Sequence, residues 1–228
     1  FAKNENKLIE LIDGLESFCL NSTNSGNVSI RAEVGGSIGD IYGTVWRTDD
    51  NGNRLVTAEG RPLASAELEY LGNAAPDWTG GLTNRFNYKN LSLMFLIDGR
   101  FGGQIYSATS SQLDGSGVSG RSLEYRDGGV VVDGINEGTG QPNTESITGQ
   151  QYWQSYAGIA EPYVYDQTNV RLREFALTYN FSKDIANKIG MTNASIGLVG
   201  RNLFFFYRDA DDIDPDATLG TTLGGQGI

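Results

Sequence analysis

The chain has 228 residues, 31 of them glycine, with 11% aromatic residues and a formal net charge of −11 at pH 7. This acidity argues against nucleic acid as a partner, because few cations are available to neutralise phosphates. Histidine is absent and Cys19 is the single cysteine, which excludes a Ser-His-Asp triad, an internal disulfide and a Cys/His metal cluster.

The glycine and aromatic content favours β-structure, and no run of 18 apolar residues predicts a membrane-spanning helix. Strands of a membrane β-barrel give a much weaker hydropathy signal, so this observation leaves a barrel open. The chain begins without an initiator Met or a signal peptide, and we expect it to be a segment of a longer protein.

The N-terminal residues give an ambiguous pattern. Residues 1–12 (FAKNENKLIELI) fit a short strand, yet Leu8, Leu11, Ile12 and Leu15 also share one face of a helix. Residues 14–26 are interpreted as a polar connection. Residues 28–46 are β-prone, with a bend or bulge predicted at Gly35-Gly36. The turn signal Asp49-Asp50-Asn51-Gly52 then predicts a small hairpin within an ordered loop.

A long hairpin is predicted next, with strands over 80–88 and 91–106 and a tight turn at Lys89-Asn90. Apolar and polar residues alternate along both strands; the apolar positions are Leu82, Phe86, Tyr88, Leu91, Leu93, Phe95, Ile97, Phe101 and Ile105. Such a period of two places the two faces in different environments. About 9–11 residues of such a strand cross a bilayer. Periodicity alone does not decide whether the apolar face meets a protein core or lipid.

The C-terminal half alternates between polar and β-prone segments. Residues 107–151 are rich in Gly, Ser, Asp, Thr and Asn and predict a long loop, functional or disordered. Residues 151–165 concentrate four tyrosines and Trp153. Strands are predicted over 169–181 and 194–208, joined by a helical turn that Ser182 caps and Gly190 ends.

Link lengths between the predicted strands alternate between short and very long. The short links are 89–90 and 182–190, and the long ones are 13–79 and 107–168. Short turns on one side and long loops on the other are typical of outer-membrane barrels. Aromatic residues fall near the strand ends, where an interfacial girdle would lie: Tyr88, Tyr106, Tyr179, Phe181 and Tyr207.

Four motifs occur in the order found in one known family. Residues 72–91 read GN-x2-P-x-WTGGL-x2-F-x-YKN-x-L, and Asp98-Gly99 and Phe101-Gly102-Gly103 follow. Residues 163–179 (YVYDQTNVRLREFALTY), Gly200-Arg201-Asn202-Leu203-Phe204 and Asp214-Pro215-Asp216 come next; Val34-Gly35-Gly36 and Ile41-Tyr42-Gly43 also fit. With these motifs the chain resembles the SusC/RagA family of TonB-dependent outer-membrane transporters.

The resemblance implies an all-β fold: an antiparallel transmembrane β-barrel fragment, about five strands of a large plugged barrel with long extracellular loops. Residues 1–228 would be the C-terminal part of the barrel, with the plug domain and closing strand absent, and residues 1–12 would be a strand. Leu82, Phe86, Leu93, Phe95 and Ile97 would face outward, and Thr83, Arg85, Asp98 and Arg100 inward or toward the rim. Met94 and Leu96 break this pattern and would pack against the plug.

The implied function is import of oligosaccharides or peptides across the cell outer membrane of a Gram-negative bacterium, without enzymatic activity or a cofactor. The implied partners are the remainder of the barrel and plug, a SusD-like lipoprotein, the TonB complex through the absent plug segment, and outer-membrane lipid, but no nucleic acid. The alternative is a soluble surface glycan-binding β-domain without transport, which extraction without detergent would favour.

Aromatic residues in the predicted extracellular loops are the candidate substrate-binding residues: Trp46, Tyr152, Trp153, Tyr156, Tyr163 and Tyr165. Flat rings with polar tips suit contacts with sugars or peptides. The alternative is that these rings pack the loops together or against a lid protein.

Charged residues give weaker candidates. The acidic residues 208–216 suit a hard cation but lack the spacing of an EF-hand, so a solvated loop is the alternative to a calcium site. Asp209 and Asp211 do not place an acid and a nucleophile across a cleft, and no catalytic or metal-binding residue is predicted. Arg171 and Arg173 share the alternation of Phe175, and we expect them above the bilayer as a charged pair at a loop end.

Overall fold

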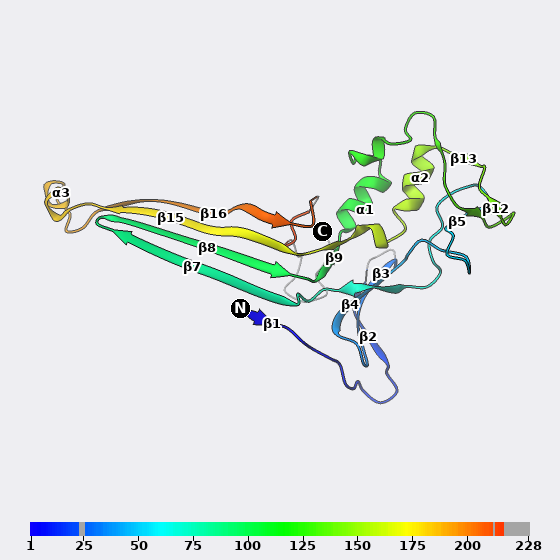
Figure 1. The fold of residues 1–228 in the computed structure, drawn as a ribbon, viewed down its shortest axis with the longest axis horizontal. Helices are drawn as coiled ribbons and strands as arrows, with labels where there is room; N and C mark the ends of the chain where they lie inside the picture. The colour runs from blue at the N-terminus through cyan, green and yellow to red at the C-terminus, as the bar shows by residue number, and fades with distance from the viewer. Residues whose placement is uncertain (23–25, 212, 217–228) are drawn as a thin grey trace. The chain divides into compact units, whose positions relative to one another are not determined.

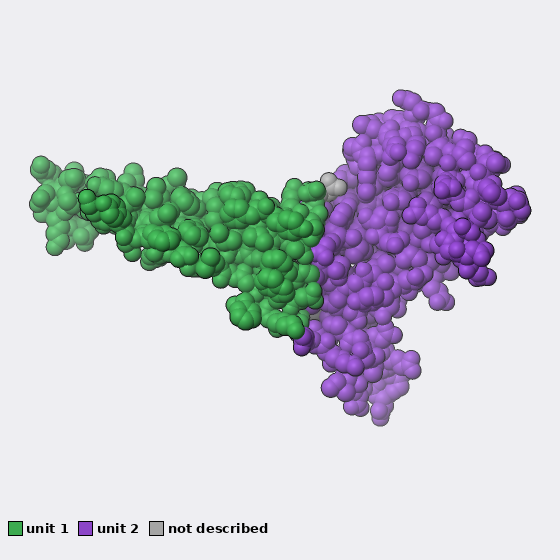
Figure 2. Space-filling model, viewed as in Figure 1, with its two compact units in different colours: residues 1–4, 76–102, 167–211 green, residues 5–75, 103–166, 212–228 purple. Residues whose placement is uncertain are grey.

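The computed structural model describes residues 1–22, 26–211 and 213–216. It divides into two compact units, which Figure 2 distinguishes by colour. Unit 1 comprises Phe1–Asn4, Pro76–Gly102 and Gln167–Asp211, and unit 2 comprises Glu5–Ala75, Gly103–Asp166 and Asp212–Ile228. Within the described ranges, no helix is long and apolar enough to cross a membrane.

Unit 1 is a five-stranded antiparallel sheet with the strand order β1-β7-β8-β15-β16 (Figure 1). Its strands are β1 (Ala2–Lys3), β7 (Trp78–Tyr88), β8 (Leu91–Phe101), β15 (Asn169–Asn180) and β16 (Ser195–Arg208). The antiparallel all-β prediction is therefore confirmed. The described residues form an open sheet rather than a closed barrel.

Short links join these strands at one end of the sheet. Lys89, with φ 51°, and Asn90 form the two-residue turn between β7 and β8. The Asn90 side chain donates to the carbonyl of Asn180 at 2.8 Å and fixes the turn to the end of β15. Helix α3 (Lys183–Lys188) links β15 to β16, and Gly190 follows it with φ 77°. The predicted helical turn is confirmed, although Ser182 makes no side-chain cap bond.

The predicted strand over 91–106 is interrupted. Gly102 and Gly103 adopt φ of 69° and 82°, a left-handed conformation that ends the ladder after Phe101. Residues Gln104–Tyr106 form a separate strand, β9, which pairs with β14 (Val164–Asp166) in unit 2. One predicted strand is thus two strands in different sheets.

Unit 2 contains a four-stranded sheet with the order β2-β3-β4-β6. The strands are β2 (Ser17–Ser22), β3 (Val28–Glu33), β4 (Ile38–Gly43) and β6 (Glu69–Asn73). The break at Gly35-Gly36 is confirmed, but the polar connection predicted over 14–26 contains β2. Residues 1–12 are a strand only at Ala2–Lys3, so most of the strand expected there is absent from this described range.

The segment predicted as a long loop after residue 107 is ordered. It contains α1 (Ala108–Gly115), η1 (Arg121–Leu123), β10 (Val130–Val131), β11 (Ile135–Asn136), β12 (Gln141–Pro142), β13 (Ser146–Ile147), α2 (Gly149–Tyr156) and η2 (Glu161–Tyr163). Strand β5 (Leu55–Val56) pairs in parallel with β11. The Asp49 turn is confirmed, because its carboxylate accepts from the amides of Asn51 and Asn53 at 2.9 Å, but the hairpin around it is reduced to the bridge between Thr48 and Arg54.

Two hydrophobic clusters stabilise unit 2. The first contains Val28, Ile30, Ile41, Ala74, Tyr106, Ala160 and Tyr163. The second contains Trp46, Val56, Val132, Ile147 and Ile159. Tyr156 packs against both clusters, so the strands and helices of this unit are connected through one aromatic side chain.

The strand break at Gly103 predicts that adding a methyl side chain at this position destabilises the protein. A Cβ at residue 103 would lie 3.2 Å from backbone atoms of Ala74 and Ala75, and the backbone has a positive φ. We expect Gly103→Ala to lower the free energy of unfolding by about 1–3 kcal/mol. Gly120→Ala is the control, since residue 120 has φ −59° and open space around it. Equal denaturation midpoints for the two variants would contradict this account.

Candidate functional site

The sheet of unit 1 has one continuous apolar face. Residues directly opposite each other in a sheet point to the same side. Leu82 is opposite Ile97 and Phe86 is opposite Leu93. The same side continues across the other strands through Phe95, Phe175, Leu177, Tyr179, Ile196 and Leu198. We call these residues the apolar face. Leu82 is 57% exposed and Leu198 68% exposed, so within unit 1 this face is not a packed core.

Aromatic side chains lie at both ends of the apolar face. Tyr179 and Phe181 contact edge-to-face at 5.3 Å near the short links, and Tyr88 ends β7 there. At the other end Trp78 stacks on Phe101 with 3.8 Å between ring centroids. The 11 residues of β7 span about 34 Å, or about 24 Å along the normal of a bilayer at a tilt of about 45°, close to the ~25 Å apolar band of membrane barrels. Tyr106 is an exception, because it is buried in the core of unit 2.

The opposite face of the sheet is mostly polar. Thr83 and Arg85 of β7 lie opposite Leu96 and Met94 of β8. The Ser92 hydroxyl donates to the Asn87 side chain at 2.6 Å, and Asp98 lies on the same side. The predicted division of side chains between the two faces is confirmed, including Met94 and Leu96 as the apolar exceptions on the polar side.

A β-bulge at Arg173 assembles charged groups on the polar face. Leu172 is opposite Ile97 while Glu174 is opposite Leu96, so Arg173 is an extra residue of β15. The shift places Arg171 opposite Asp98, so the expectation that Arg171 shares the alternation of the apolar set is wrong. The Arg173 guanidinium donates to the Asp98 carboxylate at 2.8 Å and to the Asn202 side chain at 3.1 Å. Both arginines therefore belong to the polar side.

The predicted substrate-binding aromatics gather in unit 2. Ring contacts of 5.1–6.1 Å link Trp46, Tyr152, Trp153, Tyr156 and Tyr163. Trp46, Trp153 and Tyr163 are buried, while Tyr152, Tyr156 and Tyr165 keep part of their surface exposed. The indoles donate to backbone carbonyls, Trp46 to Leu55 and Trp153 to Glu124. The rings thus pack the loop segments together, and their contact with a substrate stays a prediction.

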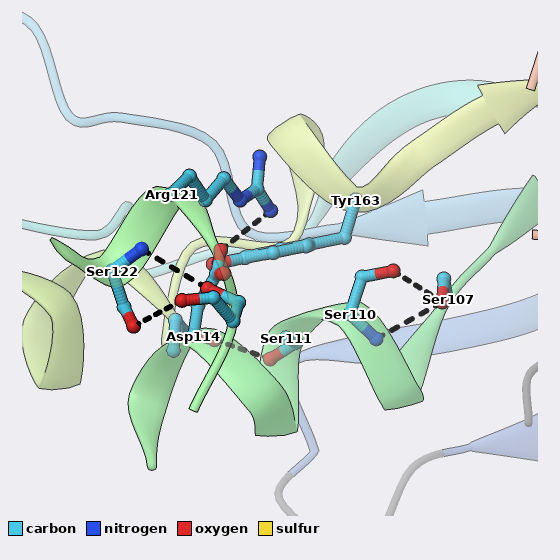
Figure 3. Close-up of polar contacts among 9 residues, drawn as sticks. Ser107, Ser110, Ser111, Asp114, Arg121, Ser122 and Tyr163 are labelled. Atoms are coloured by element: carbon cyan, nitrogen blue, oxygen red, sulfur yellow. Dashed lines mark hydrogen bonds and ion pairs between the residues drawn. The ribbon is translucent and has the colours of Figure 1, made fainter. Parts of the chain in front are cut away.

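Asp114 is a buried residue beside this cluster, and no sequence motif distinguishes it. It is 1% exposed at the end of α1 (Figure 3). One of its carboxylate oxygens accepts the Tyr163 hydroxyl at 2.8 Å and forms an ion pair with Arg121 at 2.5 Å. The Arg121 guanidinium also lies over the Tyr163 ring, 5.1 Å from its centroid. Asp114 therefore connects α1, η1 and η2.

Burial or a nearby charge raises the pKa values of Tyr163, Tyr152 and Arg121. Burial raises the pKa of Tyr163, and the hydrogen bond to Asp114 raises it further. Burial likewise raises the pKa of Tyr152 to about 12. Burial opposes the charge on Arg121, but the hydrogen bond and negative charge of Asp114 outweigh it and raise the Arg121 pKa. The phenols are hydrogen-bond donors at neutral pH, and the guanidinium is charged.

The acidic run after β16 makes local contacts in its described part. The Tyr207 hydroxyl donates to Asp209 at 2.6 Å, and Arg208 lies 3.6 Å from Asp211. No group of three metal-ligating side chains occurs in residues 1–22, 26–211 and 213–216. Position 212 of the run lies outside the described residues.

Removing the Asp114 carboxylate should loosen the loop segments that it connects. Asp114→Ala leaves the buried Tyr163 hydroxyl without its acceptor and Arg121 without its counter-charge. We expect the free energy of unfolding to fall by about 1–3 kcal/mol. This is less than the cost of breaking a fully buried ion pair, because the Arg121 side chain is 38% exposed. Hydrogen exchange at α1 and η2 measures it, and the exposed Asp50→Ala is the control. Equal protection in the two variants would show that the carboxylate does not hold these segments.

Known proteins provide an independent comparison. No family model matches the chain. TonB-dependent receptor P3 of Formosa agariphila is 24% identical over 239 residues, covering 95% of this chain and 22% of the receptor. TonB-dependent receptors P26 and P39 of the same organism are 26% and 30% identical, covering 82% and 63% of this chain and 17% and 14% of those receptors. The chain thus spans about a fifth of the length of the curated relatives it matches.

Solved structures agree on the fold. The structure of the RagAB peptide transporter matches 97% of this chain and 23% of its own chain, with a TM-score of 0.55 and 16% identity. The RagAB peptide importer in the "open-open" state matches 96% of this chain and 23% of its own, with a TM-score of 0.55 and 18% identity. These names describe receptors and a transporter rather than enzymes. The chain is thus similar in sequence to a segment of TonB-dependent receptors, and its fold matches part of the RagAB transporter.

Proposed function

We propose that residues 1–228 form the C-terminal part of the barrel wall and extracellular loops of an outer-membrane nutrient importer in a Gram-negative bacterium. The plug domain and the remaining strands would belong to other parts of a longer chain. The relatives support this, because this chain matches about a fifth of their length. The proposed cargo is an oligosaccharide or a peptide.

One observation carries the proposal: the long strands of unit 1 present an exposed apolar face with aromatic residues at both ends. In water such a face would be unfavourable, since each buried apolar Å² is worth about 25 cal/mol. Against lipid chains it is satisfied, while the backbone groups are bonded between strands. The polar face would then line the lumen, where the charged groups around Arg173 contact plug or solvent.

The links between strands support the proposed orientation. The connections at 89–90 and 181–194 are short, whereas residues 4–77 and 102–168 carry the two elaborated connections. Barrels of the outer membrane keep short turns on the periplasmic side and long loops outside. The long connections would therefore be extracellular loops, and a SusD-like lipoprotein would close over them. The TonB complex would act on the plug.

Exposure sorts the six aromatic candidates for substrate contact. Tyr152, Tyr156 and Tyr165 keep exposed surface and are the candidates for touching cargo directly. The buried Trp46, Trp153 and Tyr163 would position those rings through the contacts that join them.

Adjacent residues of β7 test the proposal. Leu82 and Thr83 lie near the middle of the strand on opposite faces. In the full-length parent protein, Leu82→Arg should reduce the folded barrel recovered from outer membranes, because arginine facing lipid near the midplane costs about 2–4 kcal/mol. Thr83→Arg should leave it near the wild-type amount, because residue 83 faces the lumen. Heat-modifiable mobility on gels measures the folded fraction.

Two results would contradict the proposal. One is equal loss of folded protein in the Leu82 and Thr83 variants. The other is recovery of the wild-type parent from cells in a monodisperse form without detergent, which would favour a soluble surface β-domain.

A further inference from the structure

The sheet of unit 2 has a polar face away from its core. Val28, Ile30 and Ile41 point into the first hydrophobic cluster. The alternate residues Asp40 and Tyr42 of β4 point to the other side, and Tyr42 pairs with Tyr70 of β6. The two tyrosine rings contact edge-to-face at 5.8 Å. Tyr70 is 58% exposed, so this face offers an accessible aromatic surface.

A segment near the N-terminus forms a wall beside these rings. The backbone of Leu8 exchanges hydrogen bonds with Gly35 and Gly36 at 2.8 and 2.9 Å. The Asn6 side-chain oxygen accepts from the Ser37 hydroxyl at 2.6 Å and from the Ile38 amide at 2.8 Å. Together with Lys7 and the β3–β4 turn, the wall and the tyrosines line an open cleft of about 490 Å³. We call it the Tyr42–Tyr70 cleft.

The carboxylate in the cleft is fixed by its surroundings. Asp40 is buried, and its two oxygens accept from the Asn73 side chain at 2.7 Å and the Ser37 amide at 3.0 Å. A Cβ at Gly36 would lie 2.6 Å from the carboxylate. Glycine at 36 therefore allows the turn to close over Asp40, and the carboxylate keeps further lone pairs for a ligand.

Both phenols remain neutral. The Tyr42 hydroxyl donates to Glu33, and this bond, together with burial, raises the pKa of Tyr42 to about 12. Burial and the charge of Asp40 raise the pKa of Tyr70. Arg31 lies 4.9 Å from the centre of the Tyr42 ring, so the ring of Tyr70 is the more accessible one.

We propose that the Tyr42–Tyr70 cleft binds one or two sugar units of a neutral saccharide. The C–H face of a sugar ring packs against Tyr70, and its hydroxyls meet acceptors on Asp40 and donors on Asn6, Lys7 and Tyr70. The positive charge of Lys7 balances Asp40, so the cleft selects for hydroxyl groups rather than net charge. The proposal deepens the proposed function by naming a substrate class, and it depends on that function for how the ligand arrives.

A peptide fits this cleft less well. An extended peptide commonly adds to a sheet as a further strand and pairs with the backbone at an edge. The cleft instead lies over the face of the sheet, and its polar groups come from side chains. Side chains with both donors and acceptors beside an aromatic ring match a ligand that carries hydroxyls all around it.

The test measures binding to the full-length parent protein in detergent by calorimetry. The probes are maltohexaose, laminarihexaose, cellohexaose and xylohexaose, with a pool of neutral hexapeptides for comparison. We expect at least one hexasaccharide to bind, and Tyr70→Ala to weaken its binding by roughly tenfold. Tyr70→Phe, which keeps the ring, should lose much less. Asn6→Asp keeps the oxygen that holds the wall but removes the amide donor, and should also weaken binding.

Phe18→Ala is the matched control, an exposed aromatic residue of β2 in the same sheet but outside the cleft. Equal affinities of the Tyr70→Ala and Phe18→Ala variants would overturn the proposal. So would the failure of every hexasaccharide to bind, or hexapeptide binding that depends on Tyr70. Outer-membrane insertion of the parent protein is measured separately. If the parent inserts normally but no saccharide binding depends on Tyr70, the cleft proposal is wrong and the proposed function is unaffected.

Discussion

Cross-strand register among β7, β8, β15 and β16 decides which side chains of unit 1 lie on each side of its sheet. Leu82 opposite Ile97, Phe95 opposite Phe175 and Leu177 opposite Leu198 keep most large apolar groups on one side, Met94 and Leu96 being exceptions. Because side chains alternate with a period of two, a slip of one residue would move a whole strand's apolar set to the polar side. The two-residue turn at Lys89-Asn90 fixes the register of the first pair, and Asn90 extends that control to β15.

The bulge at Arg173 uses the same rule locally. One extra residue reverses the alternation of β15. Odd-numbered residues before the bulge, such as Arg171, therefore face the polar side, whereas those after it, such as Phe175, face the apolar side. Both arginines thereby lie on the polar side, where Arg173 bonds Asp98 and Asn202 and Arg171 lies opposite Asp98. A charged group that would be costly against lipid instead joins a polar cluster. The same strand can therefore be apolar near the short links and charged toward the long connections.

The long connections bury their apolar surface in the two hydrophobic clusters of unit 2. They do so around aromatic rings centred on Tyr156, which packs on both hydrophobic clusters. Asp114 and Arg121 fix the helices beside that centre. Loops that are ordered in this way hold their outward-facing side chains in defined positions, which binding residues on a loop require.

The sequence predicts those elements that are set by interactions between residues close together in the chain. Strands β7, β8, β15 and β16 were predictable, because alternation and turn chemistry are local signals. Strand β2 was missed, because its polar segment SFCLNS becomes a strand only through pairing with β3. The break at Gly102-Gly103 was missed because the apolar alternation continues through it to Ile105.

The candidate site shows the same division. The sequence placed Trp46 and Tyr163 correctly among loop aromatics, but their burial depends on contacts between distant segments. Tyr125 contacts the Tyr152 ring at 5.1 Å, and Asp114 holds Tyr163, yet both stand in Gly- and Ser-rich surroundings with no periodic pattern. The bulge that moves Arg171 also has no local sequence signal, since it is set by the strands on either side.

In the proposed barrel, the apolar face of unit 1 meets lipid. Single spin labels at residues 81–87 of the full-length parent, with Cys19 replaced by serine and reconstituted in vesicles, test it most directly. We expect high accessibility to oxygen dissolved in lipid at 82, 84 and 86, and high accessibility to a water-soluble nickel complex at 81, 83, 85 and 87. The absence of this alternation, or its reversal, would show that this face does not meet lipid.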